Sequence, residues 1–113
     1  MQFFMYSTDP IDPNAPPPTP EFMAEMGKFI EDTAKSGVLV TTGAFDDKKR
    51  TRVRLADGKY SVTDGPFIEA KELMGGFAVI RVKSLEEAIG WAKRFRDIVG
   101  EGSSDIVPIW GAE

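Results

Sequence analysis

The amino-acid sequence predicts one α+β domain in which short apolar strands alternate with two amphipathic helices. Apolar residues recur at helical spacing in two stretches, β-branched or apolar runs of strand length lie between them, and an Asp-Gly pair joins two such runs. The 113 residues match the length of a single domain. We therefore expect one domain over residues 1–113.

The first segments are expected to be a strand, an extended loop and a helix. Met1–Tyr6 is an apolar run without helical period, which is typical of a strand buried on both faces. Between Thr8 and Pro20 six prolines, which lack backbone donors, predict an extended loop. Thr19 is a good N-cap, and Gly37 can adopt the left-handed conformation that ends a helix. The side of this helix expected to face the core carries Phe22, Met26, Phe29, Ile30 and Thr33.

A strand at Val38–Thr42 and a charged loop at Phe45–Arg50 are predicted next. The loop holds Asp46, Asp47, Lys48, Lys49 and Arg50, which we expect to face water. Thr51–Leu55 and Lys59–Thr63 then flank Asp57-Gly58, the preferred pair for a type I′ hairpin.

The hairpin turn fixes which residues share a face. Leu55 should lie opposite Tyr60 and Val53 opposite Val62 on an apolar side. On the other side Arg54 should lie opposite Ser61 and Arg52 opposite Thr63, which makes that side basic.

The last elements are expected to be a strand at Phe77–Val82, a second helix and a strand at Ser104–Trp110. Ser84 with Glu87 three residues later is a capping box. Pro108 predicts an edge position, because proline cannot donate to a neighbouring strand. The buried side of the second helix is expected to carry Leu85, Ala88, Ile89, Ala92, Phe95 and Val99.

Apart from the hairpin, this order reads β-α-β-β-α-β. It predicts a ferredoxin-like antiparallel sheet with an extra β-hairpin and both helices on one face. Several strands are apolar on both sides, so the open face of the sheet should be too hydrophobic to stay in water. We therefore expect a homodimer that buries this open face.

Composition excludes several classes of function. A net charge of −4 and a pI near 4.9 argue against nucleic-acid binding. No apolar stretch approaches the roughly 20 residues needed to cross a membrane, and the start lacks signal-peptide features, so we expect a cytoplasmic protein. The chain has neither cysteine nor histidine, which removes thiol chemistry and the usual general base. We expect no metal and no cofactor.

Asp64 is the candidate catalytic residue. It ends a strand just before Gly65, and hairpin alternation places its carboxylate on the side of Val62 and Tyr60. Desolvation there would raise its pKa and suit it to acid/base work. The alternative is that Asp64 caps the turn by accepting backbone N–H groups.

Four further residues are candidates for substrate binding. Phe67 and Tyr6, together with Phe4 and Phe77, could wall a pocket for a small organic molecule, or they could be ordinary core residues. Arg54, with Arg52, could bind an anionic substrate or could simply be solvated. Lys71 could hold a ligand acid or pair with a neighbouring carboxylate, Glu69 or Glu72.

The same region resembles a known family, the YCII-related proteins, and within it the branch named for its DGPF motif. The matching elements are Asp64–Phe67, the Glu-x-Lys-Glu run at Glu69–Glu72, Gly75–Phe77, the Val38–Gly43 step and the Asp57-Gly58 turn. The resemblance covers nearly the whole chain. Ile68 and Ala70 depart from the small and hydroxyl residues expected at those positions.

This resemblance implies a face-to-face dimeric α/β barrel. It also implies a catalytic His-Asp pair, whose histidine would fall near Met26 here, so the pair is broken in this chain. Proteins of this branch are often linked to alternative sigma factors, which implies a regulatory role. Two functions therefore compete: an enzyme-like dimer that acts on a small molecule through Asp64, and a non-catalytic module that binds a ligand or a transcription partner.

Overall fold

The computed structural model describes residues 1–10, 14, 16–65 and 72–111. In chain order its strands and helices are β1 (Gln2–Pro10), α1 (Pro20–Lys35), β2 (Leu39–Ala44), the short 3₁₀ turn η1 (Asp47–Lys49), β3 (Thr51–Ala56), β4 (Lys59–Asp64), β5 (Glu72–Arg81), α2 (Leu85–Val99) and β6 (Ser103–Pro108). Neither α1 nor α2 is long and apolar enough to cross a membrane.

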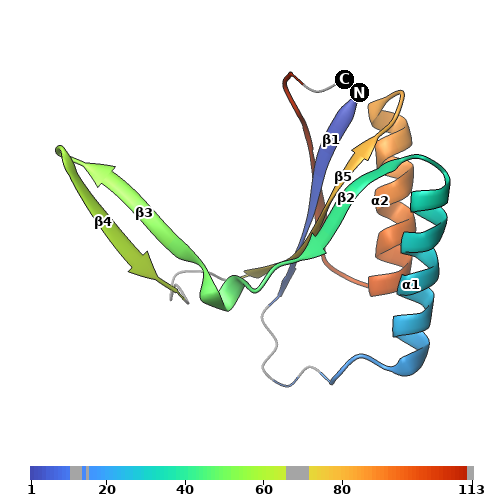
Figure 1. The fold of residues 1–113 in the computed structure, drawn as a ribbon. Coiled ribbons are helices and arrows are strands. Elements are labelled where there is room, and N and C mark those ends of the chain that lie inside the picture. Colours follow the sequence, from blue (N-terminus) through green and yellow to red (C-terminus); the bar gives the residue numbers. More distant parts are fainter. Residues whose placement is uncertain (11–13, 15, 66–71, 112–113) are drawn as a thin grey trace.

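The main sheet is antiparallel, with the strand order β2-β5-β1-β6, and both helices lie on one face of it (Figure 1). Leaving out the hairpin, this is the ferredoxin-like order: β1 and β5, which precede the two helices, lie side by side in the centre, and β2 and β6, which follow the helices, lie at the edges. The predicted fold class is confirmed. β6 lies at an edge, as Pro108 indicated.

Strands β1 and β5 run further than predicted, into segments expected to be loop. Their pairing continues from Ser7↔Gly76 through Thr8↔Met74 to Pro10↔Glu72, with a bulge at Gly75. Proline is tolerated at the end of β1 because β6 stops pairing at Thr8, so that Pro10 has a neighbouring strand on one side alone. Gly75 and Gly76 therefore lie inside a strand.

The predicted helix ends are confirmed. The hydroxyl of Thr19 accepts from the N–H of Phe22 at 3.1 Å, and Gly37 has φ +79° just beyond the end of α1. At the start of α2 the hydroxyl of Ser84 accepts from the N–H of Glu87 at 3.2 Å. The Glu87 carboxylate in turn accepts from the N–H of Lys83 at 3.0 Å.

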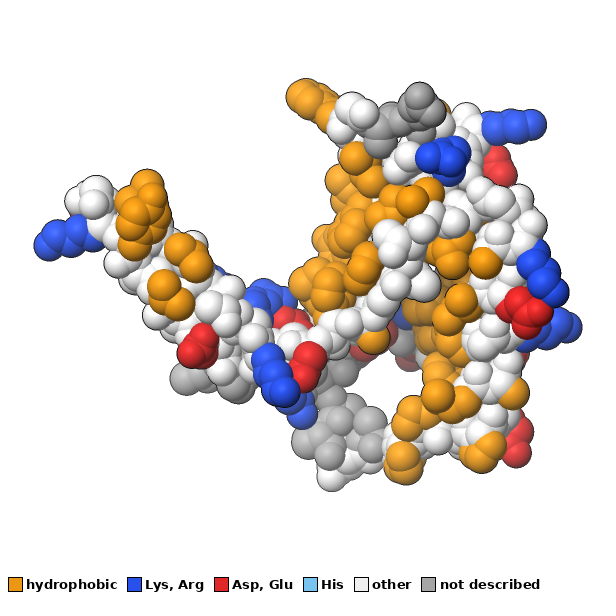
Figure 2. Space-filling view, viewed as in Figure 1, with side chains coloured by type: hydrophobic (Ala, Val, Ile, Leu, Met, Phe, Trp, Pro, Cys, Tyr) orange, Lys and Arg blue, Asp and Glu red, His pale blue; other side chains and the backbone are white. Residues whose placement is uncertain are grey.

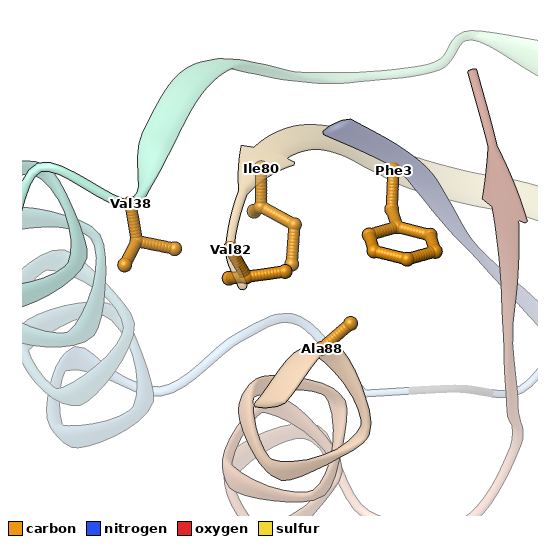
Figure 3. Close-up of a cluster of buried hydrophobic side chains, with 5 residues drawn as sticks. All are labelled: Phe3, Val38, Ile80, Val82 and Ala88. Carbon is orange, nitrogen blue, oxygen red and sulfur yellow. The ribbon is translucent and has the colours of Figure 1, made fainter. Parts of the chain in front are cut away.

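The core lies between the sheet and α2. It consists of Phe3, Val38, Ile80, Val82 and Ala88, with Phe3, Ile80 and Val82 directed toward Ala88 of α2 (Figure 3). The predicted buried side of α2 is partly wrong, because Leu85 and Ile89 are exposed whereas Trp91 packs against the core. The small Ala88 and Ala92 set the rotation of the helix, since they let it approach the sheet closely.

Strands β3 and β4 form a separate two-stranded sheet that projects away from the main sheet, here called the arm (Figure 1). The predicted register is confirmed, with Leu55 opposite Tyr60, Val53 opposite Val62 and Arg54 opposite Ser61. Asp57 has φ +52° and Gly58 φ +73°, which are the positive angles that a type I′ turn requires. Every residue of the arm is exposed.

The expectation that the whole Phe45–Arg50 loop faces water is wrong for Asp47. Its side chain is 7% exposed, and its carboxylate accepts from Nε of Arg50 at 2.6 Å and from the N–H of Met74 at 2.9 Å. These bonds tie η1, at the base of the arm, to the start of β5. They also lower the pKa of Asp47 below its ordinary value, the Met74 bond having the larger effect.

Candidate functional site

An apolar cavity of about 360 Å³ lies between α1 and the sheet. Figure 2 shows the molecule hollowed beside α1, with hydrophobic side chains along the helix side of the hollow. Both helices and all four strands of the main sheet contribute to its wall, with large side chains from Met5, Met26, Phe29, Leu39, Trp91 and Phe95. The ring of Phe29 contacts those of Trp91 and Phe95, at centroid distances of 6.2 and 6.4 Å.

The cavity exists because small residues of the sheet face the first helix. Gly43 and Ala44 of β2 and Gly76 and Ala78 of β5 line it on the sheet side. Thr33 is the buried residue of α1, whereas Met26 and Phe29, nearer its start, are half-buried and face the open space. The predicted core side of α1 is thus a cavity wall for much of its length.

Hydroxyl groups line one part of this apolar wall. Ser7 of β1 is 5% exposed, and its hydroxyl accepts from the N–H of Gly76 at 3.0 Å. Ser104 lies opposite Ser7 on β6, and its buried hydroxyl has no hydrogen-bond partner among the described residues. A buried hydroxyl without a partner carries an uncompensated desolvation cost. Ser104 is therefore a candidate contact for a bound molecule.

An ion pair lies beside these serines. A Cβ placed on Gly75 would lie 3.0 Å from both Oδ2 of Asp9 and Oγ of Ser7, so these two polar groups are near neighbours. The Arg96 guanidinium of α2 is 3.5 Å from Oδ1 of Asp9, and its Nε is buried without a partner in the described part of the chain. Neither Asp9 nor Arg96 lines the cavity, so Ser104 is the polar group of the cavity wall found without a partner among the described residues.

Tyr6, one of the predicted binding residues, belongs to the open face of the sheet. Its ring lies 5.7 Å from that of Phe4, which is 5.8 Å from that of Phe77, and Phe77 is 5.1 Å from Phe45. The structure thus brings Tyr6, Phe4 and Phe77 together as expected. Asp105, opposite Tyr6 on β6, raises the Tyr6 pKa, first by accepting its hydroxyl proton in a hydrogen bond and then by its charge.

Asp64 and Arg54 lie on the arm. The carboxylate of Asp64 accepts from the hydroxyl of Thr51 at 3.0 Å, and it shares a face with Val62 and Tyr60, as predicted. That face is exposed, so the described residues of one protomer do not form the expected apolar surroundings of Asp64. Arg54 is exposed on the opposite side of the arm. Phe67 and Lys71 lie outside the described residues.

Among the described candidates, Tyr6 lines the cavity together with Phe77, whereas Asp64 and Arg54 lie on the arm, so these candidates do not form one site within a protomer. The walls that the helices and the serines contribute to the cavity were not predicted. The sequence gives a weak signal for the cavity. The signal is the occurrence of serines and small residues at alternate positions of otherwise apolar strands. Among the described residues no acidic cluster is arranged to hold a metal ion.

Comparison with known proteins places these features in context. A family model for the YCII-related domain matches residues 1–111. No curated protein matches the chain. Among solved structures, a similar chain is the periplasmic divalent cation tolerance protein CutA from Archaeoglobus fulgidus, at 11% identity and a TM-score of 0.45, over 100% of this chain and 88% of that one. Such a distant likeness supports no conclusion about function.

Proposed function

The chain belongs to the YCII-related domain family, and we propose that it is a binding protein for a small, largely apolar organic molecule. The observation that carries this proposal is the cavity of about 360 Å³ between α1 and the sheet. Its size is that of a small-molecule pocket, and such pockets are mostly apolar with a few polar anchors. An apolar ligand would replace the packing that the core lacks beneath α1.

The polar groups of the cavity indicate what else the ligand carries. The hydroxyl of Ser104 lines the cavity and is buried without a partner among the described residues, and a hydroxyl can donate a hydrogen bond. A ligand with a hydrogen-bond acceptor, such as a carbonyl or carboxylate group, would satisfy this hydroxyl. We infer an apolar molecule with one acceptor group at its end.

Binding is favoured over turnover by the residue at Met26. The family resemblance places a histidine near this position, and here the side chain of Met26 is part of the apolar cavity wall. A thioether cannot transfer a proton, and the chain has no histidine to replace it. The cavity thus retains space for a ligand without the expected proton-transfer group.

The test is probe binding to a cavity-filled variant. Ala78 of β5 lines the cavity, whereas its neighbour Val79 points to the open face. We expect Ala78→Phe to weaken binding of a neutral naphthylamine probe by about tenfold or more, measured by fluorescence titration. The new ring would take the space of the probe, and losing the burial of one apolar group costs more than about 1.4 kcal/mol of binding free energy, which corresponds to tenfold in Kd. The matched control Val79→Phe should stay within about twofold of the original protein.

Equal probe affinity in Ala78→Phe, Val79→Phe and the unchanged protein would contradict the cavity as the binding site. Far-UV circular dichroism checks that both variants are folded. If Ser104 holds the acceptor, Ser104→Ala should weaken a probe that carries a carboxylate more than it weakens the neutral one.

A second candidate function keeps Asp64 as an acid/base residue. It is favoured by the position of Asp64 on the apolar side of the arm, beside Val62, where a second protein surface would desolvate it. A thermal-shift screen of the protein and of Asp64→Asn tests this role. A compound that stabilises the protein but not the folded variant would support it, and a variant that melts far lower without any ligand response would indicate a structural cap.

We also propose that the protein is a homodimer that buries the open face of its sheet. The aromatic side chains of Phe4, Tyr6 and Phe77 on this face support the proposal, because a patch of this kind is unfavourable in water.

A further inference from the structure

The arm presents an apolar face that none of the described residues covers within one protomer. Val53 is 66% exposed, Leu55 60%, Tyr60 75% and Val62 67%, and pairing places all four on the same side of β3 and β4. A row of four large apolar side chains on one face is not the scatter expected of a solvated surface.

The arm also lacks the packing that a hairpin needs. A two-stranded sheet is at best marginally stable in water unless a further layer covers it. Among the described residues the arm makes no substantial packing contact with either helix or with the main sheet. Its other face is polar, with Arg54 opposite Ser61 and Arg52 opposite Thr63. The arm is therefore built with one side for water and one side for a partner.

The open face of the main sheet has the matching character. Phe4 and Tyr6 of β1, Phe77 and Val79 of β5 and Val107 of β6 lie on the side away from the helices. Figure 2 shows hydrophobic side chains on the arm and on the sheet, on either side of a notch between them. Two uncovered apolar surfaces of one chain thus border the same notch.

We propose that the arm of each protomer docks its apolar face onto the open sheet face of a second copy. This inference rests on the proposed homodimer and names what covers the face. A second copy is the fitting occupant because each protomer offers both surfaces, so one twofold arrangement covers both arms and both sheets at once. Each arm then enters the notch of the other protomer, and the assembly closes at two copies.

The area involved is that of a stable dimer. Four exposed side chains of this size offer roughly 400 Å² of apolar surface on each arm, at about 100 Å² apiece. Two arms and the two sheet surfaces they cover would together bury about 1,600 Å², which is the size of a standard specific interface.

The absence of cysteine in the chain allows a direct test by crosslinking. Two single-cysteine variants, Val62→Cys on the arm and Val79→Cys on the open sheet face, are mixed and treated with a short flexible bis-maleimide. Mass spectrometry should find the mixed product, which can form only between two chains. Ser61→Cys, on the polar side of the same strand, is the matched control and should give at least about fivefold less mixed product with Val79→Cys.

The assembly itself is measured by sedimentation of the protein and of the double variant Val53→Lys with Val62→Lys. We expect the unchanged protein to be a dimer and the variant to have a dimer Kd at least about tenfold higher. The core does not include the arm, so far-UV circular dichroism of the variant should remain that of a folded protein. The polar-side double variant Ser61→Lys with Thr63→Lys should dimerise like the unchanged protein.

The possible results separate the two ideas. A monomeric unchanged protein would overturn both the homodimer and the docked arm. A dimer that persists in the Val53→Lys with Val62→Lys variant, without arm-to-sheet crosslinks, would overturn the docked arm and leave the homodimer in place.

Discussion

Ser7 on β1 and Ser104 on β6 lie opposite each other at the cavity, yet their hydroxyl groups are in different states. The hydroxyl of Ser7 accepts from the N–H of Gly76 at 3.0 Å, and that of Ser104 is buried without a partner in the described part of the chain. Substituting each of the two serines therefore compares the contribution to stability of a hydrogen-bonded buried hydroxyl with that of a buried hydroxyl without a partner.

Alanine substitutions at these serines should have opposite effects on stability. Ser7→Ala leaves the Gly76 N–H without its acceptor and should lower the free energy of unfolding by about 1–3 kcal/mol. Ser104→Ala removes a buried hydroxyl that has given up its hydrogen bonds to water without forming one to the described residues. The free energy of unfolding should therefore be unchanged or rise by up to about 1 kcal/mol. Urea denaturation of both variants at one protein concentration measures this. A loss in Ser104→Ala as large as in Ser7→Ala would show that Ser104 has a partner.

The carboxylate of Asp47 should make folding sensitive to acid. Its folded-state pKa is lowered, so its stabilising effect is complete above the unfolded-state value of about 3.9 and is lost as the pH falls through the lower folded-state pKa. Asp47→Asn should therefore cost about 1–2 kcal/mol at pH 7 and progressively less below about pH 4. Denaturation curves across this pH range measure the difference.

Asp46 is the matched control for that experiment. Its side chain is 63% exposed and lies 3.7 Å from the ammonium of Lys49, an arrangement that contributes little. Asp46→Asn should change the free energy of unfolding by less than about 0.5 kcal/mol at any of these pH values. A constant cost of Asp47→Asn down to pH 3 would argue against an ionised Asp47 as the cause.

Two glycines should respond in opposite directions to alanine. A Cβ on Gly76 would lie 3.1 Å from the carbonyl oxygen of Gly43, a backbone atom of the neighbouring strand that cannot turn aside. Gly76→Ala should therefore destabilise by about 1–3 kcal/mol. Gly90, within α2, has nothing within 4 Å of a Cβ, so Gly90→Ala should stabilise by about 0.5–1 kcal/mol. Thermal melts of both variants check the pair, and a stable Gly76→Ala would mean that the strands can separate.

Local signals in the sequence predicted most of the fold. The Thr19 and Ser84 caps, the Gly37 stop and the Asp57-Gly58 turn are each set by a few neighbouring residues, and each is confirmed. The register of the arm followed from its turn alone. Errors arose where distant segments meet: β1 and β5 lengthen each other through a bulge at Gly75, and the rotation of α2 depends on how closely it packs on the sheet.

The candidate site was harder to predict, for the same physical reason. Hairpin alternation placed Asp64 correctly beside Val62, but alternation does not say whether that face of the arm is covered. The cavity depends on small residues of β2 and β5 lying opposite one part of α1, which is a property of the packed layers. Asp47 looked like one of several solvated charges, and its partner Met74 lies far along the chain.

The hydrogen bond between Tyr6 and Asp105 can be measured by titration of the tyrosine. The negative carboxylate favours the neutral phenol, so the Tyr6 pKa is raised. The stability that this bond contributes is therefore present below the unfolded-state pKa of about 10 and is lost as the pH rises through the folded-state pKa. In Asp105→Asn the hydrogen bond is weaker and the charge is gone, so Tyr6 should ionise at lower pH than in the unchanged protein. Ultraviolet absorbance follows both tyrosines of the chain, and Tyr60→Phe isolates the signal of Tyr6.

An unchanged titration curve in Asp105→Asn would mean that Asp105 does not act on Tyr6. Because Tyr6 lies on the open face, a shift found only at protein concentrations that favour dimers would instead report the burial of this face by a second copy.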